Sequence, residues 1–281
     1  MKIYISVDME GLAGISNWTE ENEERERFRR AMNQQVEWVL EGIQASSRNE
    51  EITQITIADS HGGGSNLSYD RLSDFDRRVY LVNGSPRPYY MMAGLDESYD
   101  MVFFVGYHAG AGELAGAMDH TYSGKVVHNF WLNGQKMNEA TLNAGYAAAC
   151  GVPVGLVIGD AALGRQLLDD KMMPWVNFVC TKEALGRFAG IFRPKEDIRH
   201  ETVQAVQEVL DREPKSFPLY PLQGPFLAQV ELTSSSMADC AALIPGSQRV
   251  DGRTVALELD DYKELFNGII AICKLAGSSY C

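Results

Sequence analysis

The sequence contains no long hydrophobic run. Its 281 residues nowhere approach the roughly 18 consecutive apolar residues that a transmembrane helix requires. The opening segment, MKIYISVDMEG, reaches two acidic side chains by position 10 and lacks the longer apolar stretch and small-residue cleavage site of a signal peptide. We therefore expect a protein that neither crosses a membrane nor is exported by the signal-peptide route.

Cysteine is scarce, and basic residues are outnumbered. The five cysteines are scattered and form no C-x-x-C pair, which disfavours a disulfide framework and a structural zinc knuckle. The 25 Lys and Arg against 38 Asp and Glu give a net charge of −13, so no basic excess is available for nucleic acid or an anionic membrane. These features predict a reduced, cytoplasmic protein with no nucleic-acid or membrane partner, whose acidic balance is compatible with bound cations.

Strands alternate with helices over the first two thirds of the sequence. β-Branched, aromatic and apolar runs predict strands at 2–8, 52–59, 79–82, 101–108 and 154–158. Apolar residues three and four apart predict a long helix over 20–47. Asn133-Gly134 after 126–132 indicates a hairpin, and Asn138 can cap a helix that continues to Cys150. This order predicts a three-layer α/β/α domain with a mainly parallel sheet.

The pattern changes after about Phe192. A predicted helix over 195–210 and a proline-rich stretch precede a strand around 226–232, a short helix, a hairpin near 249–259 and a closing helix from Asp261. We expect two domains, namely a metal-binding catalytic α/β domain over 1–192 and a smaller α+β domain over 193–281.

Two carboxylates follow the first predicted strand. Asp8 and Glu10 are two positions apart, so their side chains point the same way if the extended backbone continues. Such neighbours repel each other unless a cation lies between them. A helix N-cap or a surface pair is the alternative for either residue alone.

Histidines end two further predicted strands. His61 precedes Gly62–Gly64, a run that lacks the Gly-Lys-Ser/Thr of a phosphate loop. His108 ends an apolar strand in which packing does not require it, although a hydrogen-bonded core histidine is the alternative. Because ligand sites in open α/β sheets lie beyond the carboxyl ends of the strands, we expect both histidines to lie near Asp8 and Glu10.

Glu139 and His120 complete the candidate site. Glu139 begins a predicted helix, where a carboxylate is favoured by the helix dipole alone. Together with Asp8 and Glu10 it supplies three negative charges, which two divalent ions and one hydroxide balance. His120 lies in a glycine-rich loop beyond His108 and is a candidate general acid/base or electrostatic stabiliser. Zinc, manganese and cobalt all suit such carboxylate and imidazole ligands.

These residues fall into an ordered set of motifs. They are Ser6-x-Asp8-x-Glu10-Gly11, Asp59-Ser-His61, Gly106-Tyr-His108-Ala, Met118-x-His120, and Asn138-Glu139 followed by Leu142-Asn143-Ala. The set resembles that of the zinc-dependent D-aminopeptidases of peptidase family M55, over the whole chain.

The resemblance implies a two-zinc site. Its ligands are, position by position, Asp8 as the bridge between both ions, Glu10, His61, His108 and Glu139, and the family's proposed nucleophile matches His120. It also implies a self-compartmentalising decameric ring with active sites that face an inner chamber. The glycine-rich loop after His61 and a slightly long segment between His108 and His120 depart from the family pattern, which leaves substrate preference open.

We therefore expect a binuclear zinc aminopeptidase that hydrolyses short peptides from the N-terminus, with a preference for N-terminal D-amino acids such as D-alanine. The metals polarise the scissile carbonyl and generate a hydroxide-like nucleophile, and His120 fits proton transfer or stabilisation of the tetrahedral intermediate better than direct attack. One alternative is another bimetallic hydrolase, such as a phosphoesterase, against which stands the lack of an Arg/Lys cluster at the strand ends. The other is a non-catalytic peptide-binding accessory protein, against which stands the intact ligand set.

Overall fold

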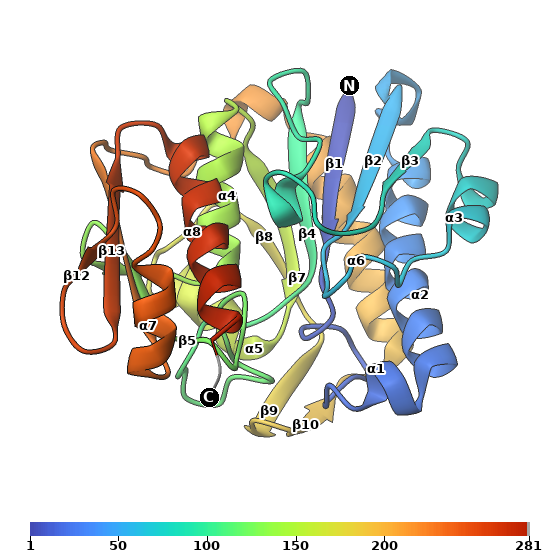
Figure 1. Ribbon diagram of the computed structural model, residues 1–281. Coiled ribbons are helices and arrows are strands. Elements are labelled where there is room, and N and C mark those ends of the chain that lie inside the picture. The colour runs from blue at the N-terminus through green and yellow to red at the C-terminus, as the bar shows by residue number, and fades with distance from the viewer. Residues whose placement is uncertain (280–281) are drawn as a thin grey trace.

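A parallel six-stranded sheet forms the centre of the computed structural model, which describes residues 1–279 (Figure 1). Its strand order is β3-β2-β1-β4-β7-β8. The strands are β1 (Lys2–Val7), β2 (Gln54–Asp59), β3 (Val79–Val82), β4 (Met101–Tyr107), β7 (Val154–Gly159) and β8 (Asn177–Cys180). β1 pairs with β2 on one side and β4 on the other, both in parallel register. The prediction of a mainly parallel sheet is confirmed, and β2, β1 and β4 are neighbours in it.

Helices cover both faces of this sheet. On one face, α2 (Arg25–Ala45) packs against α6 (Lys195–Leu210) over a core that includes Ile3 and Ile5. On the other face lie α4 (Glu139–Ala149) and α8 (Tyr262–Gly277), over a core that includes Tyr4 and Phe104. This alternation along β1 is the expected consequence of a strand buried on both sides. The predicted three-layer α/β/α architecture is confirmed.

A second sheet lies on the far side of α4 and α8 (Figure 1). It is antiparallel, with the order β12-β13-β11-β5-β6. The strands are β5 (Val127–Leu132), β6 (Gln135–Lys136), β11 (Phe226–Leu232), β12 (Gln248–Arg249) and β13 (Thr254–Leu259), and α7 (Ser235–Ala241) packs beside them. Asn133 and Gly134 both have positive φ, as the predicted hairpin turn requires.

The division into two domains at residue 192 stays a prediction. β5 and β6 precede this residue but pair within the second sheet, whereas α6 follows it but packs against α2. None of the helices in the described part of the chain is long and apolar enough to cross a membrane.

Several elements differ from the sequence prediction. One unbroken helix over 20–47 is wrong, because the non-helical backbone of Glu24 separates α1 (Glu20–Glu23) from α2. The buried Glu20 carboxylate instead accepts hydrogen bonds from the backbone N–H groups of Ser16 and Asn17, which ties α1 to the preceding loop. The structure adds β8, α3 (Tyr69–Phe75), α5 (Ala161–Gly164), a π-helical turn (Arg165–Asp169), the hairpin of β9 (Lys182–Gly186) and β10 (Ala189–Phe192), and 3₁₀ turns at Asn49–Glu51, Tyr90–Met92 and Pro214–Ser216.

Candidate metal centre

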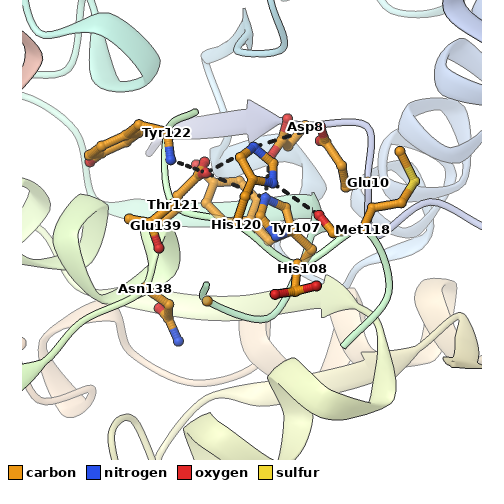
Figure 2. Close-up of polar contacts among 12 residues, drawn as sticks. Asp8, Glu10, Tyr107, His108, Met118, His120, Thr121, Tyr122, Asn138 and Glu139 are labelled. Atoms are coloured by element: carbon orange, nitrogen blue, oxygen red, sulfur yellow. Dashed lines mark hydrogen bonds and ion pairs between the residues drawn. The ribbon is translucent and has the colours of Figure 1, made fainter. Parts of the chain in front are cut away.

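The predicted site residues converge at the carboxyl ends of three adjacent strands. Figure 2 shows Asp8, Glu10, His108, His120 and Glu139 of this set. Asp8 follows β1, His61 follows β2 and His108 follows β4, while Glu139 is the first residue of α4. All four side chains are buried, and so is that of Glu10. The structure therefore brings together the five residues that the sequence proposed as metal ligands.

Short contacts join these residues into one cluster. The Nδ1 atom of His61 lies 3.3 Å from a carboxylate oxygen of Asp8 and 3.3 Å from one of Glu10. The Nε2 atom of His108 lies 3.6 Å from Asp8 Oδ2 and 3.4 Å from Glu139 Oε1. Asp8 thus stands between the two histidines, which is the place that a carboxylate shared by two ions would occupy.

His120 reaches the same cluster from the loop after β4. Its Nε2 atom lies 3.5 Å from Glu139 Oε1 and 3.9 Å from Glu10 Oε1, and its ring stacks on His108 at a centroid distance of 4.3 Å. Figure 2 shows one nitrogen of the ring directed toward the carboxylates and the other toward the Met118 carbonyl of the loop. This position suits a proton-transfer group, and it also places a ligand atom within reach of a bound ion.

Backbone carbonyls fix which nitrogen of each ring faces the carboxylates. Nδ1 of His108 lies 2.9 Å from the carbonyl oxygen of Ala109, and Nδ1 of His120 lies 3.0 Å from that of Met118. A carbonyl oxygen can only accept a hydrogen bond, so in the neutral rings the proton belongs on Nδ1. Each Nε2 then presents a lone pair toward the cluster, as a metal ligand or a general base requires.

The donor set fits divalent cations. Two groups of three side chains hold ligand atoms within 4.8 Å of one another, namely Asp8, Glu10 and His108, and His108, His120 and Glu139. Glu10 Oε2 and His108 Nε2 are buried and have no hydrogen-bond partner within residues 1–279. Buried polar atoms are normally satisfied, so two such atoms in one cluster of carboxylate and imidazole groups indicate a cation site.

The electrostatics of the cluster point the same way. Burial and the neighbouring Glu10 carboxylate raise the pKa of Asp8 to about 7. Burial opposes charge on His108, but the Glu139 carboxylate outweighs it and raises the pKa of His108 to about 10. By contrast, burial and the positive charge of His108 lower the pKa of His120. Positive charge between the carboxylates therefore stabilises their ionised forms. His120, by contrast, favours its neutral form, which can accept a proton.

Four further motif residues form one hydrogen-bonded chain beneath the ligands. The Ser6 hydroxyl lies 2.7 Å from both the Ser60 hydroxyl and the Tyr107 hydroxyl. Asn143 donates to the Tyr107 hydroxyl at 2.8 Å and accepts from Tyr122 at 3.0 Å. These hydrogen bonds link β1, β2, β4 and α4. They therefore fix the relative positions of the elements that carry the candidate ligands.

Two acidic residues outside the cluster order its loops. Asp160 accepts hydrogen bonds from the backbone N–H groups of Ala109 and Ala117, at the two ends of the loop that leads from His108 toward His120. Asp59 accepts from the N–H groups of Asn66 and Leu67, beyond the glycine-rich turn. Both carboxylates therefore act on the backbone and are not placed as ligands.

Sequence reasoning missed two residues whose polar side chains contact the candidate ligands. Trp18 donates its indole N–H to Glu10 Oε1 at 2.6 Å, and a carboxylate oxygen of Glu21 lies 3.4 Å from Nε2 of His61. Glu21 begins a charged run over 21–30 whose composition is typical of a solvated helix face. A carboxylate on the outer nitrogen is a common means of orienting a metal-bound histidine. No local pattern in the sequence distinguishes Glu21 from its acidic neighbours.

The cluster opens into a cavity of about 530 Å³. Asp8, Glu10, His61, His120 and Glu139 all line it. The rest of the wall includes Trp18, Tyr90, Tyr122, Lys125 and Arg187. The size suits a short peptide or another small molecule.

Comparison with known proteins agrees with this geometry. The family model Peptidase_M55, described as D-aminopeptidase, matches residues 1–271. A D-aminopeptidase of Bacillus subtilis (strain 168) is 29% identical over 286 residues, which cover 100% of both sequences. The solved structure of the Zn-dependent D-aminopeptidase DppA from Bacillus subtilis, described as a self-compartmentalizing protease, matches with a TM-score of 0.89 and 26% identity over 100% of both chains. The chain belongs to the M55 family of D-aminopeptidases.

Proposed function

We propose that the chain is a binuclear zinc aminopeptidase, with Asp8 as the bridging ligand and Glu10, His61, His108 and Glu139 as the others. The observation that carries this proposal is the convergence of these five buried side chains, all of which except His108 line one cavity. Two of their ligand atoms have no hydrogen-bond partner within residues 1–279. The Zn-dependence of the solved relative favours zinc over manganese or cobalt.

Bound zinc ions would polarise the scissile carbonyl and acidify water at neutral pH. The protein's own part is to position and to move protons. His120 is held by the Met118 carbonyl with its Nε2 lone pair toward the cavity, so it can take a proton from the attacking water and return it to the leaving amine. Trp18 restrains Glu10, and the chain of Ser6, Tyr107 and Asn143 restrains the strand ends, so little reorganisation is needed during turnover.

The proposed substrates are short peptides with an N-terminal D-residue such as D-alanine. Support for this stereopreference comes from the D-aminopeptidase relative and from membership of the family. We also propose a cytoplasmic, ring-shaped homo-oligomer, decameric by the resemblance stated above. The self-compartmentalizing relative supports the ring, as do Leu185 and Ile191, exposed apolar residues of the β9–β10 hairpin. A monomeric mass by light scattering in reductant would contradict it.

The lining of the cavity is also compatible with a second candidate function, that of a phosphoesterase. The sequence argument against it was the missing cationic cluster, yet the structure places Lys125 and Arg187 in the cavity wall. Family membership favours peptide hydrolysis over this rival.

A substrate panel tests the proposal. Purified protein loaded with zinc should release p-nitroaniline faster from D-alanyl than from L-alanyl p-nitroanilide, and should leave p-nitrophenyl phosphate intact. Turnover of the phosphate ester alone would favour the rival. No turnover of any substrate by zinc-loaded protein would favour a non-catalytic peptide-binding role.

A further inference from the structure

The cavity beside the metal centre carries charge of both signs. Its acidic residues surround the proposed zinc site. Within residues 1–279, one lysine and one arginine also line the cavity, namely Lys125 and Arg187. The hydrolytic step proposed above uses neither of them. Cations placed at one part of a substrate cavity are suited to bind an anionic group of the substrate.

Arg187 projects from the tip of the β9–β10 hairpin and is held in place by its surroundings. Its Nη2 atom donates to the carbonyl oxygen of Asp119 at 2.8 Å, and its Nε atom lies 3.2 Å from the Asp119 carboxylate. The guanidinium also lies over the rings of Trp18 and Phe188, at 5.3 and 5.4 Å from their centroids. These polar contacts involve Nε and Nη2. A guanidinium has five N–H donors, so the N–H groups of Nη1 are available to donate hydrogen bonds to a ligand.

Lys125 is exposed on a loop whose backbone is fixed. The carbonyl oxygen of Lys125 accepts a hydrogen bond of 2.8 Å from Thr233, and Val127 N–H bonds the Ser123 carbonyl at 3.0 Å. At the start of the same loop, Tyr122 N–H donates to Glu139 at 2.6 Å. The Lys125 ammonium forms no ion pair within residues 1–279. The loop therefore carries an uncommitted charge beside the cavity.

Gly124 shows how near Arg187 lies to His120. A methyl group at this glycine would lie 3.2 Å from Arg187 Nη2 and 3.3 Å from His120 Cβ. The guanidinium and His120 therefore flank the same glycine. One extended residue spans about 3.3–3.6 Å. A peptide whose scissile carbonyl lies at the zinc site can thus place a carboxylate one or two residues further along near Arg187.

We propose that Arg187 and Lys125 form a subsite for the free C-terminal carboxylate of the substrate. The favoured substrates are then unblocked peptides of two or three residues, because a longer chain carries its carboxylate past both cations. The subsite rests on the proposed aminopeptidase function for the position of the scissile bond. A hydrogen bond to a charged group contributes enough to change affinity roughly tenfold to a hundredfold.

The experiment compares D-alanyl-D-alanine with its C-terminal amide, which differs in the charge of that end. Turnover of both is measured for the zinc-loaded parent, Lys125→Met, Arg187→Met and Lys195→Met. Lys195 is an exposed residue at the start of α6 and does not line the cavity, so it is the matched control. Calorimetric binding of both peptides to chelator-treated protein provides a second measurement that needs no catalysis.

The parent and Lys195→Met should favour the free acid over the amide in kcat/KM by roughly tenfold or more. Lys125→Met and Arg187→Met should bring this ratio toward one, mainly through a higher KM for the free acid. Arg187 also contacts Asp119, the residue before His120, so a fall in the kcat of Arg187→Met with an unchanged acid-to-amide ratio reflects positioning. Within residues 1–279 the Lys125 ammonium forms no ion pair, so Lys125→Met removes the charge without breaking one.

Three results would overturn the subsite. The first is equal kcat/KM of the parent for the free acid and the amide. The second is a ratio of these two values that neither Lys125→Met nor Arg187→Met changes. The third is equal affinity of the chelator-treated protein for the two peptides in calorimetry. Failure of the proposed function looks different. In that case the parent cleaves neither peptide, while chelator-treated protein still binds the free acid more tightly and loses this preference in Lys125→Met.

Discussion

At the scale of single residues, two glycines let the strand ends that carry the candidate ligands approach each other. A Cβ atom on Gly106 would lie 2.3 Å from the carbonyl oxygen of Asp8, and one on Gly11 would lie 1.7 Å from that of Tyr107. Gly106 also has a φ of +74°, in the left-handed region that side chains disfavour. The Gly of the Gly-Tyr-His motif is thus required by the spacing between β1 and β4.

Gly106→Ala should push the end of β4 away from Asp8. We expect a loss of about 2 kcal/mol or more in the free energy of unfolding, and weaker zinc binding, because His108 and Asp8 move apart. Denaturant unfolding and metal analysis provide the measurement. Gly63→Ala is the control, since a methyl there meets nothing within 4 Å and its φ is not positive. Equal stability and equal zinc content in the two variants would contradict this account of Gly106.

His120→Ala separates proton transfer from metal binding. If the five other side chains hold the zinc, the variant should keep the parent's metal content while kcat falls by roughly 10²–10⁴-fold. Loss of one zinc ion would instead make His120 a ligand, a role that its position near His108 and Glu139 permits. A nucleophile would be revealed by an acyl-imidazole trapped on His120 in acid-quenched turnover, which an acid/base role does not produce.

The sequence allowed the candidate metal ligands to be identified, but not the residues that hold them in place or line the cavity beside them. Asp8, His61 and His108 could be identified because each ends a recognisable strand of a parallel sheet, where ligands gather. Trp18 and Arg187 could not, because they lie in a loop and at a hairpin tip whose paths depend on tertiary packing. Nothing in their local sequence indicates that they reach the cavity.

At the scale of elements, the start of β9 anchors the loop between β1 and α1. Thr181 donates its hydroxyl hydrogen to the carbonyl oxygen of Gly11, and the Lys182 ammonium donates to that of Ile15 at 2.5 Å. Lys182 is buried, and burial lowers its pKa to about 8. A strand that begins with a buried lysine does not match the apolar pattern of a core strand, which is why β9 escaped prediction. β4, by contrast, contains no charged residue and is buried along its whole length.

The buried Lys182 predicts a specific pH dependence of stability. Below pH 8 the lysine is protonated in both the folded and unfolded states, so the cost of burying its charge is fully present. Between pH 8 and 10.5 the unfolded chain binds more protons than the folded one, so this contribution to the free energy of unfolding rises with pH. The full gain is about 3 kcal/mol.

Denaturant unfolding of the parent and Lys182→Met at pH 7.5, 8.5 and 9.5 measures this effect. The free energy of unfolding of the parent minus that of the variant should increase steadily over the series. The subtraction removes groups that titrate alike in both proteins. A difference that stays flat or decreases with pH would show that the pKa of Lys182 is not lowered.

At the scale of the whole molecule, the candidate metal centre lies where three layers of structure meet. The parallel sheet supplies Asp8, His61 and His108, while α4 supplies Glu139 and separates this sheet from the second one (Figure 1). Much of the order of strands and helices could be predicted from apolar patterns, whereas β8, the β9–β10 hairpin, α3 and α5 could not. How β5 crosses to pair with β11 could not, because antiparallel partners far apart in sequence leave no local signal.

Zinc titration of chelator-treated protein tests the central claim most directly. Hydrolysis of D-alanyl p-nitroanilide is followed as zinc is added back to a known concentration of chains. A binuclear site predicts that activity rises to a plateau at about two zinc ions per chain. A plateau at one ion per chain, or no hydrolysis at any zinc concentration, would contradict the binuclear aminopeptidase.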